Sequence, residues 1–413
     1  MRVLYITYDG LTDPLGQSQV LPYLLGTAED GHEITVLSFE KPDRFALLGS
    51  DVERRCAAAG MRWVPQRFRS RPPYLAKAID QAAMRREALK LAGEGRFDAV
   101  HCRSYPSAVA GVAVKQRHGT KLIFDMRGFW PDSRREGGRW NSSNPLGALL
   151  YRHWKRLETR FVSDADHIVT LAQSARSEIE TWDSYRGAPI SVIPCCADFE
   201  LFRPSPAEER AKTRKELGFA EDEPVLLYVG SLGTIYRLSD HLRLFAAIRE
   251  RDSSIRMLFV GHHDAEDIRN QSSALGIKLE RSELAVVAAE RPQMSKWISA
   301  GDVGTCYILP KYFSLAVSPT KLGEYLACGV PTIANGNVGD VEAVIEAVDG
   351  GHVLKDFSEV EFSEAADAFF RLIERDRAGI RTRARTLLDL PLAIDAYRRI
   401  YSDMSTAVVA GIA

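Results

Sequence analysis

The sequence has no long hydrophobic run, no patterned set of cysteines and no dinucleotide-binding glycine motif, and each absence removes a class of protein. No segment reaches the roughly 18 consecutive apolar residues that a membrane-spanning helix requires. The first ten residues, MRVLYITYDG, are too short and too polar for a signal peptide, so a cytoplasmic protein is expected. Six cysteines without metal-type spacing predict buried free thiols. The motif GxGxxG is absent, which disfavours a dehydrogenase.

Length and composition indicate a soluble protein of two domains. The chain has 413 residues, which is more than one hydrophobic core usually organises. Hydrophobic residues make up 45% and charged residues 26%, as in ordinary globular proteins. The formal net charge is −1, so no general attraction to nucleic acid is expected.

Short apolar runs alternate with longer helical patterns along the whole chain. The runs are apolar on both faces, which is typical of parallel strands covered by helices on each side. They are 3–8, 33–38, 98–102, 121–125, 167–171 and 190–194, then 224–230, 255–261, 284–289, 302–308, 330–334 and 351–354. This alternation predicts an α/β fold with two doubly wound, Rossmann-like sheets.

A charged segment that opens with two prolines separates the two halves. Residues 203–223 predict an inter-domain linker that includes a short solvated helix. We therefore place the first domain at 1–202 and the second at 224–389. Ligands of open α/β sheets bind beyond the carboxyl ends of the strands, so two such domains facing a central cleft would carry their sites on the loops that follow strands.

A glycine-containing loop follows the first strand of each half. Gly16 lies close to a helix start near residues 17–18, where free backbone N–H groups and a small residue admit a phosphate. An ordinary βα turn explains Gly16 equally well. In the second half, Gly230 and Ser231 follow the strand, and Arg237 is placed to neutralise phosphate charge.

The segment SPTKLGEYLACGVPTIA, which begins at Ser318, predicts an anion site at the start of a helix. Thr320 and Lys321 lie on the first turn, where the helix dipole favours an anion. Glu324 lies one turn further and can accept hydrogen bonds from the two hydroxyls of a vicinal diol. This pairing suits a nucleoside diphosphate sugar, whereas a solvated helix face is the simpler alternative for the isolated residues.

The same segment resembles the donor-binding element of glycosyltransferase family 4, whose members have the GT-B fold. Segments 21–38, 163–179, 192–204, 228–233 and 396–401 also match that family in order, so the resemblance spans nearly the whole chain. It implies a retaining, metal-independent enzyme that holds the nucleotide sugar mainly on its second domain and the acceptor on its first. It also implies that the last helix, 390–413, packs back on the first domain.

The resemblance assigns roles to several of these residues and shows three departures. Glu324 matches the second glutamate of the family's E-x7-E element, which holds the donor ribose. Ala316 stands where the first glutamate is expected, and Ser231 and Tyr236 replace the usual arginine and lysine. We expect Arg237 and Lys321 to supply the missing charge, and the loop at Gly16 to match the family's phosphate-facing loop.

Candidates for the acceptor or the transferred sugar follow two strands of the first half. Arg127 takes the place of the histidine that the family commonly has, and Asp132 lies nearby as a second catalytic candidate. Trp130 would stack on a sugar, and Arg103 with Tyr105 would face the same cleft. A structural ion pair of Arg127 with Asp125 or Asp132 is the alternative.

The sequence predicts no metal site and no cofactor besides the sugar-nucleotide substrate. Asp164-Ala165-Asp166 has DxD spacing, but its context is a helix end, so we expect no metal there. The expected partners are a nucleotide-sugar donor, linked to UDP or GDP, and a glycan, lipid-linked or small-molecule acceptor of bacterial surface polysaccharide or glycoconjugate synthesis. An epimerase of the same fold, or a weakly catalytic nucleotide-sugar binding protein, remains the competing hypothesis.

A basic stretch from Arg62 to Lys90 contains eight Lys and Arg residues and two acids. Aromatic residues are interleaved with them, which fits an anionic membrane surface or a pyrophosphate-bearing lipid better than nucleic acid. A solvated helix face is the alternative. The protein is therefore expected in the cytoplasm, with a peripheral membrane contact as an option.

Overall fold

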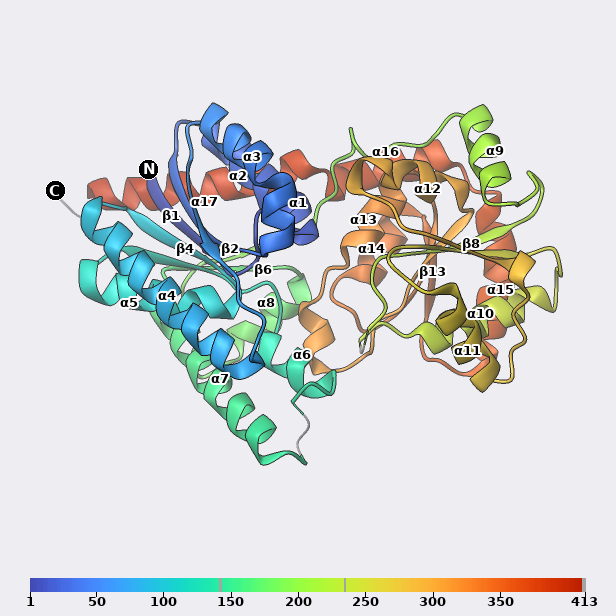
Figure 1. The fold of residues 1–413 in the computed structure, drawn as a ribbon, viewed down its shortest axis with the longest axis horizontal. Coiled ribbons are helices and arrows are strands. Elements are labelled where there is room, and N and C mark those ends of the chain that lie inside the picture. Colours follow the sequence, from blue (N-terminus) through green and yellow to red (C-terminus); the bar gives the residue numbers. More distant parts are fainter. Residues whose placement is uncertain (141–142, 234, 411–413) are drawn as a thin grey trace. The chain divides into compact units, whose positions relative to one another are not determined.

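The computed structural model describes residues 1–140, 143–233 and 235–410, which divide into two compact units. Unit 1 contains Met1–Pro194 and Leu390–Ala413, and unit 2 contains Cys195–Asp389. Each unit is a parallel α/β sheet with helices on both faces (Figure 1). The two Rossmann-like domains expected from the sequence are confirmed.

Unit 1 is built on a seven-stranded parallel sheet of order β3-β2-β1-β4-β5-β6-β7. In chain order its elements are β1 (Arg2–Thr7), α1 (Pro14–Gln19), α2 (Leu21–Ala28), β2 (Glu33–Glu40), α3 (Pro42–Ala58), β3 (Arg62–Arg67), α4 (Pro73–Glu94), β4 (Ala99–Arg103), α5 (Ser104–His118), β5 (Lys121–Asp125), α6 (Trp130–Glu136), α7 (Pro145–Asp164), β6 (His167–Thr170), α8 (Gln173–Glu180), β7 (Ile190–Val192) and α17 (Leu390–Ala410). The chain order reverses beside β1, between β1 and β4, so the loops after these strands lie at a topological switch point.

Unit 2 is built on a six-stranded parallel sheet of order β10-β9-β8-β11-β12-β13. Its elements are α9 (Ala207–Glu216), β8 (Val225–Val229), α10 (Leu238–Arg249), β9 (Arg256–Val260), α11 (Ala265–Ala274), β10 (Leu284–Val287), α12 (Met294–Ala300), β11 (Val303–Cys306), α13 (Thr320–Ala327), β12 (Thr332–Asn335), α14 (Val341–Val348), β13 (Gly351–Leu354), α15 (Glu359–Ile373) and α16 (Arg377–Leu388), with short 3-10 helices at Arg281–Glu283, Arg291–Gln293 and Tyr312–Ala316. Again the switch lies beside the first strand, between β8 and β11.

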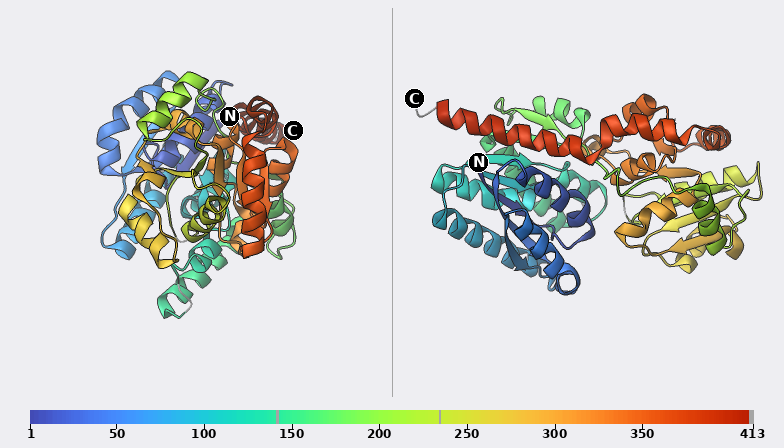
Figure 2. Two further views of the ribbon diagram at one scale, coloured as in Figure 1. Left: turned by 90° about the vertical axis from the view of Figure 1, so that its right-hand side faces the viewer. Right: turned by 90° about the horizontal axis from the view of Figure 1, so that it is seen from above.

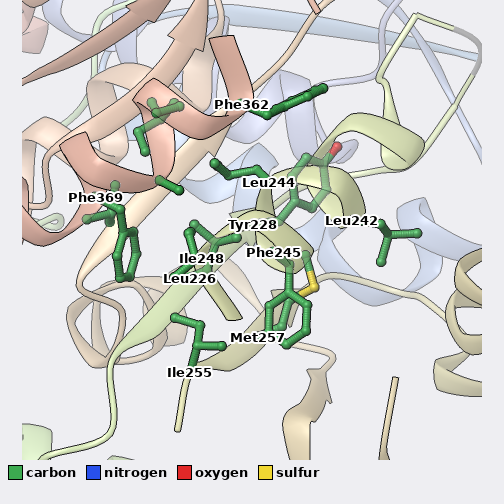
Figure 3. Close-up of a cluster of buried hydrophobic side chains, with 14 of the residues drawn as sticks. Leu226, Tyr228, Leu242, Leu244, Phe245, Ile248, Ile255, Met257, Phe362 and Phe369 are labelled. Atoms are coloured by element: carbon green, nitrogen blue, oxygen red, sulfur yellow. The ribbon is translucent and has the colours of Figure 1, made fainter. Parts of the chain in front are cut away.

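The core of unit 2 explains why its strands are easy to recognise in the sequence. Tyr228 of β8, Phe245 of α10 and Phe369 of α15 pack in one buried cluster (Figure 3). The strands contribute apolar side chains to both faces of the sheet, because helices cover both faces. Burial of apolar side chains such as these is the dominant favourable contribution to folding.

One strand at the edge of the first sheet, β3, was not predicted from the sequence. β3 pairs in parallel with β2, and its side chains are at most half-buried. Its sequence, RWVPQR, contains Pro65 and ends in arginines, so it does not read as a buried strand. Proline is compatible with an edge strand because only one side of that strand needs hydrogen bonds.

The last helix, α17, belongs to unit 1 and runs beside α2 (Figure 2). Gly26 permits this close approach, because a Cβ at that position would lie 2.5 Å from Cδ1 of Ile394. Tyr401 of α17 is buried, and its hydroxyl oxygen lies 2.7 Å from Nδ1 of His101 on β4. Of the predicted segment 390–413, residues 411–413 lie outside the described residues.

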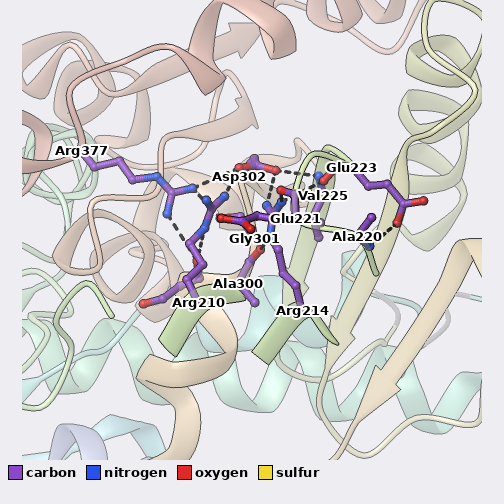
Figure 4. Close-up of polar contacts among 11 residues, drawn as sticks. Arg210, Arg214, Ala220, Glu221, Glu223, Val225, Ala300, Gly301, Asp302 and Arg377 are labelled. Atoms are coloured by element: carbon purple, nitrogen blue, oxygen red, sulfur yellow. Dashed lines mark hydrogen bonds and ion pairs between the residues drawn. The ribbon is translucent and has the colours of Figure 1, made fainter. Parts of the chain in front are cut away.

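The predicted linker 203–223 is not a separate segment, because the division falls at Pro194 and α9 lies in unit 2. Arg214 of α9 donates to Asp302 at 2.6 Å, and Arg210 pairs with the same carboxylate (Figure 4). Arg377 of α16 lies 3.4 Å from Asp302 as well. Charge in this segment therefore anchors it to the second sheet, whereas the sequence interpretation took the charge as a sign of solvation.

Candidate functional site

Polar side chains of unit 2 gather at the first turns of α13, the helix after β11. Ser318 lies just before the helix, and its Oγ accepts a hydrogen bond of 3.0 Å from the backbone N–H of Cys195. Thr320 begins the helix and is half-buried. Lys321 and Glu324 follow one turn apart, so they project from the same side of α13.

The ammonium of Lys321 is buried among aromatic rings. Lys321 is only 8% exposed, and its Nζ lies 4.0 Å from the ring centre of Tyr228 and 4.4 Å from that of Tyr236. Burial lowers the pKa of Lys321 to about 8, although the nearby Glu324 carboxylate opposes this shift. The site therefore holds a positive charge that is partly desolvated and that interacts strongly with an anion.

The carboxyl group of Glu324 is also buried, with 12% of its side chain exposed. Burial raises its pKa to about 7, against the lowering effect of Arg291 and Lys321. Nη1 of Arg291 lies 3.9 Å from Oε1 of Glu324, which is too long for a hydrogen bond. Glu324 can thus offer its oxygens to hydroxyl groups of a ligand.

Gly230 brings the end of β8 next to Lys321. Its φ is +105°, in the region that favours glycine, and a Cβ there would lie 3.6 Å from Nζ of Lys321. Nε2 of His263 lies 2.7 Å from the carbonyl oxygen of Gly230, so Nε2 carries the donated proton. A side chain at residue 230 would therefore lie in van der Waals contact with the end of the Lys321 side chain.

Three further residues were considered in the sequence analysis for the donor site, namely Arg237, Ser231 and Ala316. Arg237 pairs with the buried carboxylate of Asp240, and its guanidinium lies 4.2 Å from the ring centre of Phe357. Its charge is thus already compensated, and the expected contribution to a phosphate site loses its physical basis. Ser231 is exposed, and its carbonyl accepts from the Tyr228 hydroxyl at 2.7 Å. Ala316 is fully buried, so this position has no polar group for a sugar.

Unit 1 carries a second cluster of charges, at the carboxyl ends of β4 and β5. Asp125 is fully buried, with Nη1 of Arg103 and Nε of Arg127 each 3.9 Å from one of its oxygens. Arg103 is also buried, and its Nε lies 3.5 Å from Asp9. At these distances the guanidinium groups form ion pairs with the carboxylates but are too far away for hydrogen bonds.

Two further contacts fix the carboxylate at the centre of this cluster. The Tyr397 hydroxyl of α17 donates to Asp125 at 3.0 Å, and Nε2 of His101 lies 3.6 Å from it. Burial alone would raise the pKa of Asp125, but Arg127, His101 and Arg103 together lower it, so the carboxylate stays ionised. Arg127 has a φ of 55°, a left-handed conformation that is costly for arginine and is found mostly where surrounding structure imposes it.

Two aromatic residues expected to face a ligand have other contacts. Tyr105 is fully buried, and its hydroxyl donates to Glu158 at 2.5 Å, so its assignment to a ligand-facing position is wrong. Trp130 stacks on Tyr105 with ring centres 5.9 Å apart, and the guanidinium of Arg134 lies 4.9 Å from its ring. Trp130 itself is half-buried, so stacking of a sugar on this ring stays a prediction.

Asp132 and Gly16 also have structural contacts that explain them. Asp132 accepts from the Tyr151 hydroxyl at 2.8 Å and pairs with Lys155 at 3.1 Å, which ties α6 to α7. A Cβ at Gly16 would lie 1.9 Å from the carbonyl oxygen of Gly10. Gly16 is therefore required by close packing within its own loop, and the catalytic role of Asp132 and the phosphate role of Gly16 lose their support.

Three residues of the unit 2 cluster escaped the sequence analysis as site members. Tyr228 looked like an ordinary strand residue, and Arg291 lies in a short 3-10 helix that no motif marks. His263 follows β9 and belongs to none of the motifs discussed above. Position alone could have indicated Arg291 and His263, since both follow the carboxyl ends of parallel strands.

Comparisons with known proteins bear on this geometry. The family model for a glycosyl transferase 4-like domain matches residues 17–196, and the model for glycosyl transferases group 1 matches residues 209–385. The D-inositol 3-phosphate glycosyltransferase of Thermomonospora curvata is 24% identical over 339 residues, which cover 77% of this chain and 75% of the relative.

Solved structures show the same fold at low sequence identity. Anabaena HepE in complex with UDP-glucose has a TM-score of 0.70 at 15% identity, covering 98% of this chain and 100% of that one. A protein described as a UDP-N-acetylglucosamine 2-epimerase from Listeria monocytogenes has a TM-score of 0.60 at 11% identity, covering 98% and 96%. At such identities the likeness concerns the fold alone.

Two Rossmann-like units, each built on a parallel sheet, are the architecture of the GT-B fold. Since the two family models together cover most of the chain, the protein belongs to glycosyltransferase family 4. The expectation from the sequence is confirmed at this level.

Two kinds of feature are absent from the described residues. No helix among them is long and apolar enough to cross a membrane. Within the same residues, no group of three His, Cys, Asp or Glu side chains is arranged to hold a metal ion. All six cysteines are buried and none forms a disulfide, as their spacing predicted.

Proposed function

We propose that the protein is a retaining, metal-independent transferase that moves a hexose from a nucleoside diphosphate sugar to an acceptor in bacterial surface polysaccharide or glycoconjugate synthesis. The observation that carries this proposal is the pair of buried, oppositely charged groups one turn apart on α13, beside Gly230. Lys321 suits the diphosphate and Glu324 suits the ribose diol. The UDP-glucose named for the HepE complex makes a UDP-linked hexose the first donor to test.

In the proposed reaction, the bond between the sugar C1 and the diphosphate oxygen breaks while the acceptor oxygen bonds to C1 from the same face. The acceptor hydroxyl proton passes to the departing diphosphate. The Lys321 ammonium stabilises the negative charge that develops on that leaving group. Such preorganised charge in a desolvated site is where an enzyme gains most electrostatically, and here it replaces a metal ion.

We further propose that Arg103 and Arg127 serve the acceptor or the transferred sugar. Both guanidinium groups lie 3.9 Å from the buried Asp125, so this carboxylate holds them at the carboxyl ends of β4 and β5. The left-handed backbone of Arg127 is the kind of local strain that clusters at functional sites. The name of the Thermomonospora relative makes a phosphorylated polyol a reasonable acceptor to try.

An epimerase is the competing function that a fold neighbour raises. The two are separated by product analysis with UDP-glucose and candidate acceptors. A transferase yields a new glycoside only when an acceptor is present. An epimerase converts the sugar without any acceptor, and tight donor binding with neither product would leave a binding protein.

Glu324→Gln is expected to weaken UDP-glucose binding by roughly tenfold, because charge-assisted hydrogen bonds to the ribose are lost. Isothermal titration calorimetry measures this change. Burial raises the pKa of Glu324 from 4.5 to about 7, so the wild type loses stability as the pH rises from about 4.5 to about 7. At pH 7 and above, the glutamine variant should therefore melt no lower than the wild type. Glu364→Gln, an exposed change on α15, is the control and should alter neither value. Unchanged donor affinity in Glu324→Gln would rule out the ribose role.

Donor affinity should be greatest between about pH 7 and pH 8. Below about 7, Glu324 takes up a proton and becomes a weaker acceptor, and above about 8, Lys321 loses its charge. Titrations from pH 6 to 9 measure both limbs. Lys321→Arg should flatten the alkaline limb only, since arginine stays charged. An alkaline limb that persists in this variant would exclude Lys321 as its source.

Arg127→Gly should lower the turnover number by roughly tenfold to a hundredfold, the loss expected for one hydrogen bond to a charged group. Glycine suits the left-handed backbone, so the variant removes the side chain without adding strain. Donor affinity should stay within twofold of the wild type. Steady-state kinetics beside donor titration check both statements, and a normal turnover number would remove Arg127 from the site.

A contact of unit 1 with anionic membranes is also proposed, through the outer face of α4. Leu75, Ile79, Ala82 and Arg86 are exposed and follow helical spacing, so they form one stripe. Arg85 is exposed beside it, whereas Asp80 is buried and the Glu87 side chain is only 16% exposed. Apolar side chains next to cations suit the interface of an anionic bilayer.

Vesicle pelleting tests this contact. The wild type should sediment with vesicles that contain phosphatidylglycerol but not with pure phosphatidylcholine, and Leu75→Asp with Ile79→Asp should abolish sedimentation. Val360→Asp, which changes an equally exposed apolar residue of α15, should not. Equal sedimentation of all three proteins would contradict the α4 assignment.

A further inference from the structure

Lys321 is held by aromatic rings and not by an acid. Its Nζ lies 4.0 Å from the ring centre of Tyr228 and 4.4 Å from that of Tyr236. Within the part of the chain that the structure describes, Lys321 forms no ion pair with a carboxylate, and the Glu324 carboxylate one turn away has Arg291 as its ion-pair partner. Cation–π attraction is thus the main direct contact of this ammonium.

The two rings are supported in different ways. Tyr228 is fixed by the sheet, because it is fully buried in β8 and its hydroxyl donates to the carbonyl of Ser231. Tyr236 lies on the loop between β8 and α10. Its backbone N–H donates to Gly233 at 3.1 Å, and its backbone is bridged to Ile308, just after β11.

The choice of a ring as partner has a consequence for ligand binding. A carboxylate at this distance would neutralise the ammonium and compete with a bound diphosphate. An aromatic ring attracts the ammonium through the ring quadrupole but does not neutralise it. The N–H groups of the ammonium that do not face a ring can then donate to a ligand. Tyr236 also stands where the family resemblance leads one to expect lysine, so the site has one held cation in place of two.

We propose that Tyr236 is a positioning residue that holds the Lys321 ammonium against the donor diphosphate through its ring face. This inference rests on the proposed donor site. It predicts that the ring matters and the hydroxyl does not. It also predicts that Tyr236 acts only through Lys321, which a residue that merely fills space would not do.

A double-mutant cycle on UDP-glucose affinity tests this dependence. Tyr236→Phe should bind within twofold of the wild type, whereas Tyr236→Leu should lose roughly tenfold, in keeping with a partly desolvated cation–π contact. In a Lys321→Gln background, Tyr236→Leu should cost less than twofold further. A tenfold loss from Tyr236→Leu that persists in the Lys321→Gln background would overturn the proposal, and so would a Tyr236→Phe variant as weak as Tyr236→Leu.

A second measurement needs no donor and separates this inference from the proposed function. In protein labelled with [ε-13C]lysine, the Lys321 signal is assigned by its absence from Lys321→Arg. Two ring faces should shift it upfield, and Tyr236→Leu but not Tyr236→Phe should move it toward the ordinary lysine position. A signal unaffected by Tyr236→Leu overturns the inference. The expected NMR result in a protein that binds no nucleotide sugar would instead overturn the proposed function and leave the contact standing.

Discussion

The rest of this molecule depends on one constraint. Charged groups at the carboxyl ends of its parallel strands are removed from water. In unit 2, burial moves the pKa values of Lys321 and Glu324 toward each other, to about 8 and about 7. A buried charge without full compensation is costly, and proteins keep such groups mainly where a ligand completes them. The helix α13 carries both groups on one turn because i and i+3 positions share a face. The sheet, in turn, fixes where that helix begins.

The two units meet this cost by different means. Unit 1 surrounds one buried carboxylate, Asp125, with two guanidinium groups, an imidazole and a tyrosine hydroxyl, so opposite charges lie near each other. Unit 2 places a lone ammonium against tyrosine rings. The first arrangement orients several donors around a fixed centre, which suits recognition of many hydroxyls. The arrangement in unit 2 leaves one ammonium without a neutralising ion pair, which suits one strongly anionic group such as a diphosphate.

Sequence alone predicted the sheets well because parallel strands are buried on both faces. All twelve apolar runs form strands in the structure. The thirteenth strand, β3, was missed because an edge strand needs no continuous apolar pattern and can contain proline. The Lys321–Glu324 pair was found because it lies within a long, specific string. The sequence gives no comparable guide to Tyr105, Trp130, Asp132 or Gly16. Each follows a strand, but only packing decides whether such a residue turns outward or into the core, as Tyr105 does toward Glu158.

Burial offers one explanation for the departures from the family pattern at Ala316 and Tyr236. Ala316, at the position of the first family glutamate, is fully buried, and Arg237, which was expected to supply a missing charge, is paired with Asp240. Neither residue therefore adds an uncompensated charge beside Lys321. Adding a second free cation beside Lys321 would raise the repulsion within a desolvated pocket and lower the pKa of both. Tyr236 avoids that repulsion and still attracts the ammonium it faces. The loss of a charged residue at this position is therefore consistent with a working anion site, provided that the remaining lysine is held in place, and the aromatic ring is the group that does so.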